Sequence, residues 1–146
     1  MNDLLKITNE YRDSIGYAER IARSGLTKMP PVIISCAITG GIHGAEVNSN
    51  LPETKAAQIQ SAYDAYNAGA SLVHIHARDP KNLAVMSSNV EDYKELNARI
   101  REKCPGIIIN NTCLGGRAVL ENEDGLKVTE NMLVSLDALP EVSSVD

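Results

Sequence analysis

Residues 71–80 read SLVHIHARDP, a short apolar run with histidines two positions apart, followed by an arginine, an aspartate and a proline. An apolar run of this length, preceded by Gly69, is typical of a buried β-strand. Side chains two positions apart on a strand point to the same face. His74 and His76 are therefore predicted to reach a single metal ion from the end of one strand.

The pattern on either side of this run is an alternation of strands and helices. Each strand is apolar throughout, which indicates a parallel sheet that is covered on both faces and joined by right-handed crossovers. The predicted strands are VIISCAI at 32–38, SLVHIH at 71–76, GIIIN at 106–110 and the start of a fourth in EVSSVD at 141–146. The predicted helices are 3–24, 55–68 with Thr54 as N-cap, 89–103 with a capping box from Ser88 to Glu91, and 129–138. The connections 77–88 and 111–128 are expected to be loops.

Composition excludes several classes of protein. The chain has 146 residues, with 19 acidic against 14 basic side chains and a net charge of −5, so nucleic acid is a poor partner. Its amino terminus has no apolar segment of the kind that signal peptides or membrane spans need, so no membrane association is expected. Three cysteines without CxxC spacing favour a reduced, cytoplasmic setting.

The candidate site is built from the loops that follow the strands, because ligands of parallel α/β folds bind at the carboxyl ends of the strands. Imidazole is a common zinc ligand, and a catalytic zinc site usually has three protein ligands. The alternative is that one histidine is a hydrogen-bonded core residue and the other a loop residue. Arg78 is a candidate for holding an anionic substrate, although it and Asp79 could equally form an ion pair or a turn.

The loop after the first strand is rich in glycine, at positions 40, 41 and 44. It matches no nucleotide-binding fingerprint, and a tight turn explains it at least as well as an anion cradle. His43 and Glu46 lie in the same loop, either as a third metal ligand or base or as solvated residues.

The loop after the third strand offers a hydroxyl, two glycine amides and a cation. Thr112, Gly115 and Gly116 are predicted to cradle a substrate carboxylate, with Arg117 adding charge. Cys113 is not expected to be a nucleophile, because no neighbouring base or orienting acid is identifiable.

Several segments together resemble the beta-keto acid cleavage enzyme family, of which the 3-keto-5-aminohexanoate cleavage enzyme is a known example. The resemblance covers residues 31–146, and HIHARD is its most specific motif. It implies the amino-terminal half of a (β/α)8 TIM barrel of roughly twice this length, with the helix at 3–24 as an extension. The segments that carry it are CAITGG (36–41), LPETKAAQI (51–59), NAGASLVHIHARDP (67–80), IIINNTCLGG (107–116) and ALPEVSSVD (138–146).

The resemblance also implies a chemistry. Zn²⁺ would be bound by His74 and His76 with a glutamate from the carboxyl-terminal half, which would also supply the general base. The expected reaction is a Claisen-type acyl exchange in which a beta-keto acid and acetyl-CoA give acetoacetate and a new acyl-CoA. Thr112, Gly115 and Gly116 match the family's carboxylate-binding segment, with Leu114 as an insertion. An acidic residue of the amino-substrate enzyme is replaced by Ile42, which predicts a less charged keto acid.

The expected organisation is a helical extension at 1–30 followed by three βα units and the start of a fourth strand at 31–146. We expect the chain to be part of a longer enzyme that forms a homo-oligomer, with a small beta-keto acid and a CoA thioester as partners. Two alternatives remain: a truncated, catalytically silent polypeptide with weak metal affinity, and another metal-dependent TIM-barrel aldolase or lyase.

Overall fold

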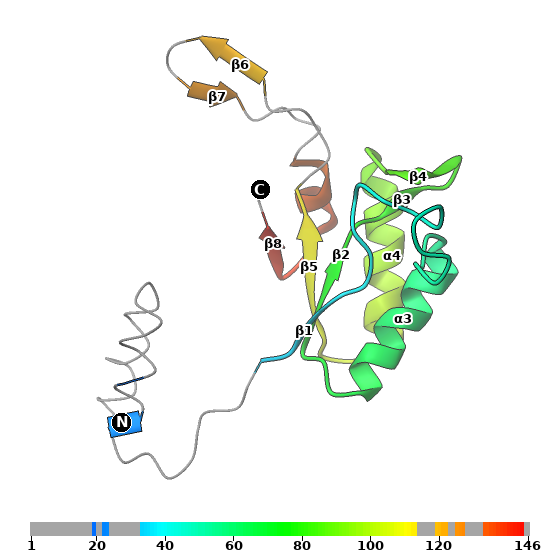
Figure 1. Cartoon of the computed structure of the whole chain (residues 1–146), viewed down its shortest axis with the longest axis vertical. Coiled ribbons are helices and arrows are strands. Elements are labelled where there is room, and N and C mark those ends of the chain that lie inside the picture. Colours follow the sequence, from blue (N-terminus) through cyan, green and yellow to red (C-terminus); the bar gives the residue numbers. More distant parts are fainter. Residues whose placement is uncertain are drawn as a thin grey trace. The chain divides into compact units, whose positions relative to one another are not determined.

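The computed structural model describes residues 33–113, 119–122, 125–127 and 133–144, together with Glu19 and residues 22–23 (Figure 1). The chain divides into two compact units, Met1–Val32 and Ile33–Asp146. In the first unit, the described residues Glu19, Ala22 and Arg23 are helical, and the rest of the predicted helix at 3–24 lies outside the described residues.

The second unit contains a parallel sheet of four strands in the order β1-β2-β5-β8. All four strands were predicted, but the structure shortens the first and moves the third towards the carboxyl end of its segment. The mixed α/β class with a parallel sheet is thus confirmed, and it is compatible with part of a TIM barrel. The strands are β1 (Ser35–Ala37), β2 (Leu72–Ile75), β5 (Ile108–Thr112) and β8 (Val142–Ser144).

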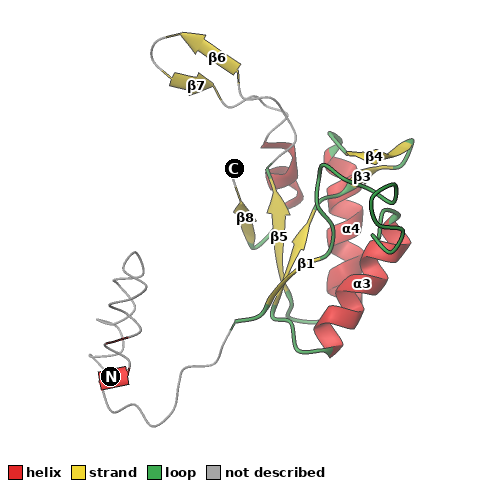
Figure 2. Cartoon of the chain, in the orientation of Figure 1, coloured by secondary structure: helices red, strands yellow, loops and turns green. Residues whose placement is uncertain are grey.

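Two helices lie on the same side of this sheet (Figure 2). Helix α3 (Lys55–Asn67) begins after Thr54, whose hydroxyl accepts a hydrogen bond from the backbone N–H of Ala57, as predicted. Helix α4 (Val90–Lys103) follows Asn89, whose side chain accepts from the Glu91 N–H. The predicted cap, Ser88, was therefore wrong by one residue.

The core lies between the helices and one face of the sheet. Val73, Ile75 and Ile109 point to this face and pack with Leu96 and Ile100 of α4. The opposite face carries the alternate residues, and Ile108 and Val142 there are 37% and 43% exposed. Within the described residues only one face is covered by helices, so cover of the second face stays a prediction.

Both long connections contain strand pairs, which corrects their prediction as loops. The first is an antiparallel hairpin of β3 (Arg78–Asp79) and β4 (Asn82–Met86). The second is a hairpin of β6 (Val119–Asn122) and β7 (Gly125–Lys127). The predicted helix at 129–138 is described only at its end, where η1 (Val134–Ala138) is a 3₁₀ helix that contributes Ala138 to the core.

No helix of the described residues is long and apolar enough to cross a membrane.

Candidate metal and substrate site

The two histidines meet at the carboxyl end of β2, as predicted. The Nε2 atom of His74 lies 2.8 Å from the Nε2 atom of His76, and the rings are edge to face with centroids 4.7 Å apart. His74 is half-buried, on the face of the sheet that the helices leave uncovered, and His76 is 8% exposed. Two imidazole nitrogens directed at one point are the arrangement that a single divalent ion needs.

The described residues bring together two candidate metal ligands and not three. No group of three or more His, Cys, Asp or Glu side chains within the described part of the chain could hold a metal ion. His43 and Glu46 are both exposed, so the structure does not bring either of them to the histidine pair as a third ligand. The Glu46 carboxylate instead accepts the backbone N–H of Gly44 at 2.8 Å, and this bond lowers its pKa.

Arg78 lies beneath the loop that follows β1. It is 2% exposed, and its guanidinium donates to the carbonyl oxygens of Gly40 at 2.5 Å and His43 at 2.7 Å, and to that of Ala84 at 3.2 Å. These contacts tie the glycine-rich loop to the β3–β4 hairpin. Its Nε atom has no hydrogen-bond partner.

The glycine-rich loop serves close packing in this structure. A Cβ atom added at Gly41 would lie 2.8 Å from the Nδ1 atom of His76 and 2.5 Å from the sulfur of Met86. Any larger residue at this position would push on the histidine ring, since these separations are shorter than van der Waals contact. The tight-turn interpretation of the loop is the one that these contacts favour.

The ends of β5 and β8 place hydroxyl groups side by side. Thr112 is 1% exposed and pairs in register with Ser144, whose Oγ is buried without a hydrogen-bond partner. Sequence reasoning missed Ser144, because only the register of β8 against β5 reveals its neighbour. Gly115, Gly116 and Arg117 lie outside the described residues.

Asn110 is a second residue that the sequence did not single out. It is the register partner of His74 on the neighbouring strand, and its half-buried side chain has an Oδ1 atom without a hydrogen-bond partner. Side chains of paired residues lie on the same face of a sheet, so Asn110 adds an amide beside the histidine pair. Cys113 is buried beside Ser135, with Sγ and Oγ 3.7 Å apart.

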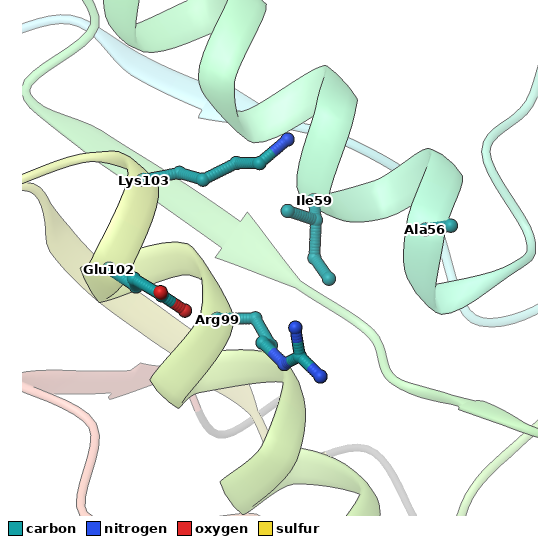
Figure 3. Close-up of a pocket in the computed structure, with 5 residues that line it drawn as sticks. All are labelled: Ala56, Ile59, Arg99, Glu102 and Lys103. Atoms are coloured by element: carbon teal, nitrogen blue, oxygen red, sulfur yellow. The ribbon is translucent and has the colours of Figure 1, made fainter.

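The outer surface has a separate cavity of about 490 Å³ between the two helices (Figure 3). Its lining residues come from α3 and α4 alone, and none follows a strand end. They are Ala56, Ile59, Arg99, Glu102 and Lys103.

The site lies in a chain that is similar to known acetyl-CoA-dependent enzymes. The model of the beta-keto acid cleavage enzyme family matches residues 31–146, and the chain belongs to that family. It is 32% identical over 127 residues to the 3-dehydrocarnitine:acetyl-CoA trimethylamine transferase of Rhizobium meliloti (strain 1021), covering 79% of this chain and 42% of that protein.

Two further relatives have other substrates in their names. The chain is 37% identical over 95 residues to the 3-oxoadipate:acetyl-CoA acetyltransferase of Cupriavidus necator, covering 65% of this chain and 32% of that protein. It is 34% identical over 99 residues to the 3-keto-5-aminohexanoate cleavage enzyme of Acetoanaerobium sticklandii, covering 68% of this chain and 35% of that protein. The chain thus spans less than half the length of these relatives. Acetyl-CoA appears in the first two of these names, and a keto or oxo acid appears in the last two.

Proposed function

We propose that this chain is the amino-terminal part of a zinc-dependent beta-keto acid cleavage enzyme, which converts a beta-keto acid and acetyl-CoA into acetoacetate and a new acyl-CoA. The observation that carries the proposal is the approach of the His74 and His76 Nε2 atoms to 2.8 Å at the carboxyl end of a parallel strand. Membership of a family of acetyl-CoA-dependent enzymes supports the same reaction.

His74 and His76 would hold the metal through Nε2, and the third ligand and general base would come from residues beyond Asp146. A bound zinc ion would supply a Lewis acid to polarise a keto oxygen. The hydroxyl of Thr112 and the amides of Gly115 and Gly116 would hold the substrate carboxylate. Asn110 and Ser144 are additional polar groups at this edge of the sheet.

Arg78 would act on an anionic substrate from behind the glycine-rich loop. Its two terminal amino groups donate to backbone carbonyls, so its charge rather than a hydrogen bond from these groups would favour the anion. Ile42, which is 74% exposed in the same loop, carries no charge for an amino group of the substrate. We therefore propose a preference for keto acids without an amino group, in an enzyme that acts in the cytoplasm as a homo-oligomer.

The test is acyl exchange by the protein that carries this chain. A panel of beta-keto acids, one of them 3-keto-5-aminohexanoate, is incubated with acetyl-CoA, and the acyl-CoA products are identified by mass spectrometry. We expect product with at least one keto acid, loss of product with a chelator, and recovery on adding Zn²⁺. Comparable turnover of the amino substrate would contradict the proposed preference.

Two substitutions connect the activity to the histidine pair. His74→Ala and His76→Ala should each lower zinc affinity by at least about 100-fold, because each removes one of the few ligands of the ion. His43→Ala is the matched control, since His43 is exposed in the neighbouring loop, and it should leave zinc affinity unchanged. Activity that is insensitive to the chelator and to both substitutions would refute the metal site.

A further inference from the structure

The His76 ring is contacted on the side that faces away from His74. Its Nδ1 atom lies 3.1 Å from the sulfur of Met86, the last residue of β4. Met86 reaches this position because it pairs with Arg78 in the β3–β4 hairpin, which folds back over the end of β2. The hairpin that the sequence did not predict therefore touches the proposed metal ligand directly.

The backbone of the glycine-rich loop encloses this contact. Gly41 leaves no room for a Cβ atom against either the His76 Nδ1 atom or the Met86 sulfur. Arg78 holds the loop in place through the carbonyl oxygens of Gly40 and His43, on either side of Gly41. The Nδ1 atom of His76 and the sulfur of Met86 are thus held in contact by the glycine-rich loop and the β3–β4 hairpin, which are far apart in the sequence.

The chemistry of the two groups determines where the proton lies. A neutral imidazole has one N–H, and a thioether sulfur can only accept a hydrogen bond. A contact of 3.1 Å between them favours the tautomer of His76 with the proton on Nδ1. That tautomer leaves an unshared electron pair on Nε2, which is what a metal ion binds.

We propose that Met86 is a positioning residue that sets His76 in the Nδ1–H tautomer before the metal arrives. This inference rests on the metal site proposed above and adds the group that prepares one of its ligands. Metal-ligating histidines usually donate their second N–H to an oxygen. Here a sulfur from a hairpin occupies that place.

The short distance between the two Nε2 atoms then determines the tautomer of His74. Nitrogen atoms 2.8 Å apart need a proton between them, and His76 Nε2 carries none in this tautomer. His74 therefore donates from Nε2 in the metal-free protein. If both Nε2 atoms are to hold a metal ion, the proton of His74 would have to move from Nε2 to Nδ1, while His76 would keep its tautomer and no net proton would be released.

Nitrogen NMR on metal-free protein with ¹⁵N-labelled histidine tests the assignment, at about pH 8, where free imidazole is neutral. The chain has only three histidines, so single His→Gln substitutions assign the signals. We expect protonated Nδ1 in His76 and protonated Nε2 in His74, and Zn²⁺ should switch His74 alone. A protonated Nε2 in His76 would overturn the proposal, whether or not zinc binds.

Substitutions at Met86 provide the second test, read out as zinc affinity by calorimetry. Met86→Leu keeps the volume and removes the acceptor, so we expect affinity to fall about 10-fold, the lower end of effects seen for such outer partners. Met86→Gln restores an acceptor at similar reach and should recover most of the affinity. Val85→Ala is the control, because its exposed side chain points to the other side of β4.

The two proposals fail in different ways. Wild-type protein that binds no zinc would contradict the metal site, while the NMR assignment would still decide the tautomer of His76. Zinc binding that is equal in the wild type and in Met86→Leu, with circular dichroism showing both to be folded, would overturn the role of Met86 alone.

Discussion

The two faces of the four-stranded sheet are built from the same strands and hold different kinds of residue. The face under α3 and α4 carries Val73, Ile75 and Ile109, all at most 1% exposed. The other face carries His74 and Asn110 towards the carboxyl ends of the strands, beside the exposed side chains of Ile108 and Val142. The two sets of residues alternate along each strand, because successive side chains point to opposite faces of a sheet.

This difference suggests that stability and chemistry are assigned to opposite faces. Apolar side chains removed from water on the helix face stabilise the fold. His74 and Asn110 on the other face are only half-buried, so we expect them to contribute less to stability. Substitutions of neighbouring residues on one strand should therefore have very different effects on the free energy of unfolding. Equal effects would contradict this assignment.

The largest expected effect is on the covered face. Ile109→Ala should lower the free energy of unfolding by about 2 to 5 kcal/mol, because it leaves a cavity beside α4. Ile108→Ala, one residue earlier and 37% exposed, should lower it by less than about 1 kcal/mol. Urea denaturation followed by circular dichroism measures both. Equal losses for the two variants would show that both faces support the fold.

The next effect concerns the polar end of the covered side, where Asp92 of α4 contacts α3 and the connection between β4 and α4. Lys55 Nζ donates to its carboxylate at 2.8 Å and Ser87 Oγ donates at 2.5 Å. Burial acts to raise the pKa of Asp92, but these two hydrogen bonds and the charge of Lys55 outweigh it and hold the pKa below 3.8. The ionised carboxylate therefore stabilises the fold above pH 3.8, and this contribution is lost as the pH falls through the lowered pKa.

Asp92→Asn should consequently cost about 2 kcal/mol of unfolding free energy at pH 7, since it removes a charged hydrogen-bond acceptor from a buried network. The difference from the wild type should shrink as the pH falls from 3.8 through the lowered pKa, because the wild-type carboxylate takes up a proton over that range. Urea denaturation at pH 7 and pH 3 checks this. A loss that is the same at both pH values would exclude the ionised pair as its source.

Much of the covered side could be predicted from the sequence. The apolar runs located four strands, and Thr54 marked the start of α3, because helix caps and buried strands have strong local signatures. The β3–β4 hairpin was missed. Its turn is marked by Asp79, whose side chain accepts the Lys81 N–H at 2.8 Å, but its strands are too short and mostly too exposed to alternate clearly.

The candidate site was predicted only where its residues are close in sequence. His74 and His76 lie two positions apart on one strand, so strand geometry alone brought them together. Strand register adds Asn110 and Ser144 to the site, and the β3–β4 hairpin adds Met86. Neither the register nor the hairpin can be read from a single sequence. Ser88 was predicted as the helix cap from its spacing to Glu91, whereas in the structure the Asn89 side chain caps α4 and the Asn89 N–H donates to Ser87 Oγ.

A smaller effect is expected where the sheet meets the chain after η1. Glu141 accepts the Ile109 N–H at 2.9 Å and two hydrogen bonds from Arg101. Burial acts to raise the pKa of Glu141, but the hydrogen bonds from the Ile109 N–H and Arg101 outweigh it and hold the pKa below 4.5. The ionised carboxylate therefore stabilises the fold above pH 4.5, and this contribution is lost as the pH falls through the lowered pKa. Because the pair is partly solvated, Glu141→Gln should cost about 1 kcal/mol or less at pH 7.

Thermal melts at pH 7 of Glu141→Gln and of the control Glu102→Gln measure this contribution. Glu102 is an exposed carboxylate on α4, and its substitution should leave the melting temperature unchanged. A shift of the same size in both variants would assign the loss to net charge and not to the contact with Ile109 and Arg101.

The smallest effect is expected at Asn110, and its neighbour Asn111 is the natural control. Asn111 points to the helix face, is fully buried, and donates to the Ser135 carbonyl oxygen at 3.2 Å, so Asn111→Ala should cost about 1 to 3 kcal/mol. Asn110→Ala removes a buried oxygen without a partner from the other face, and unfolding free energy should change by no more than about 0.5 kcal/mol. Keto acid turnover should nevertheless fall in the Asn110 variant. Two identical residues, adjacent on one strand, would then affect stability in one case and activity in the other, and equal destabilisation by both would refute the separation of the two faces.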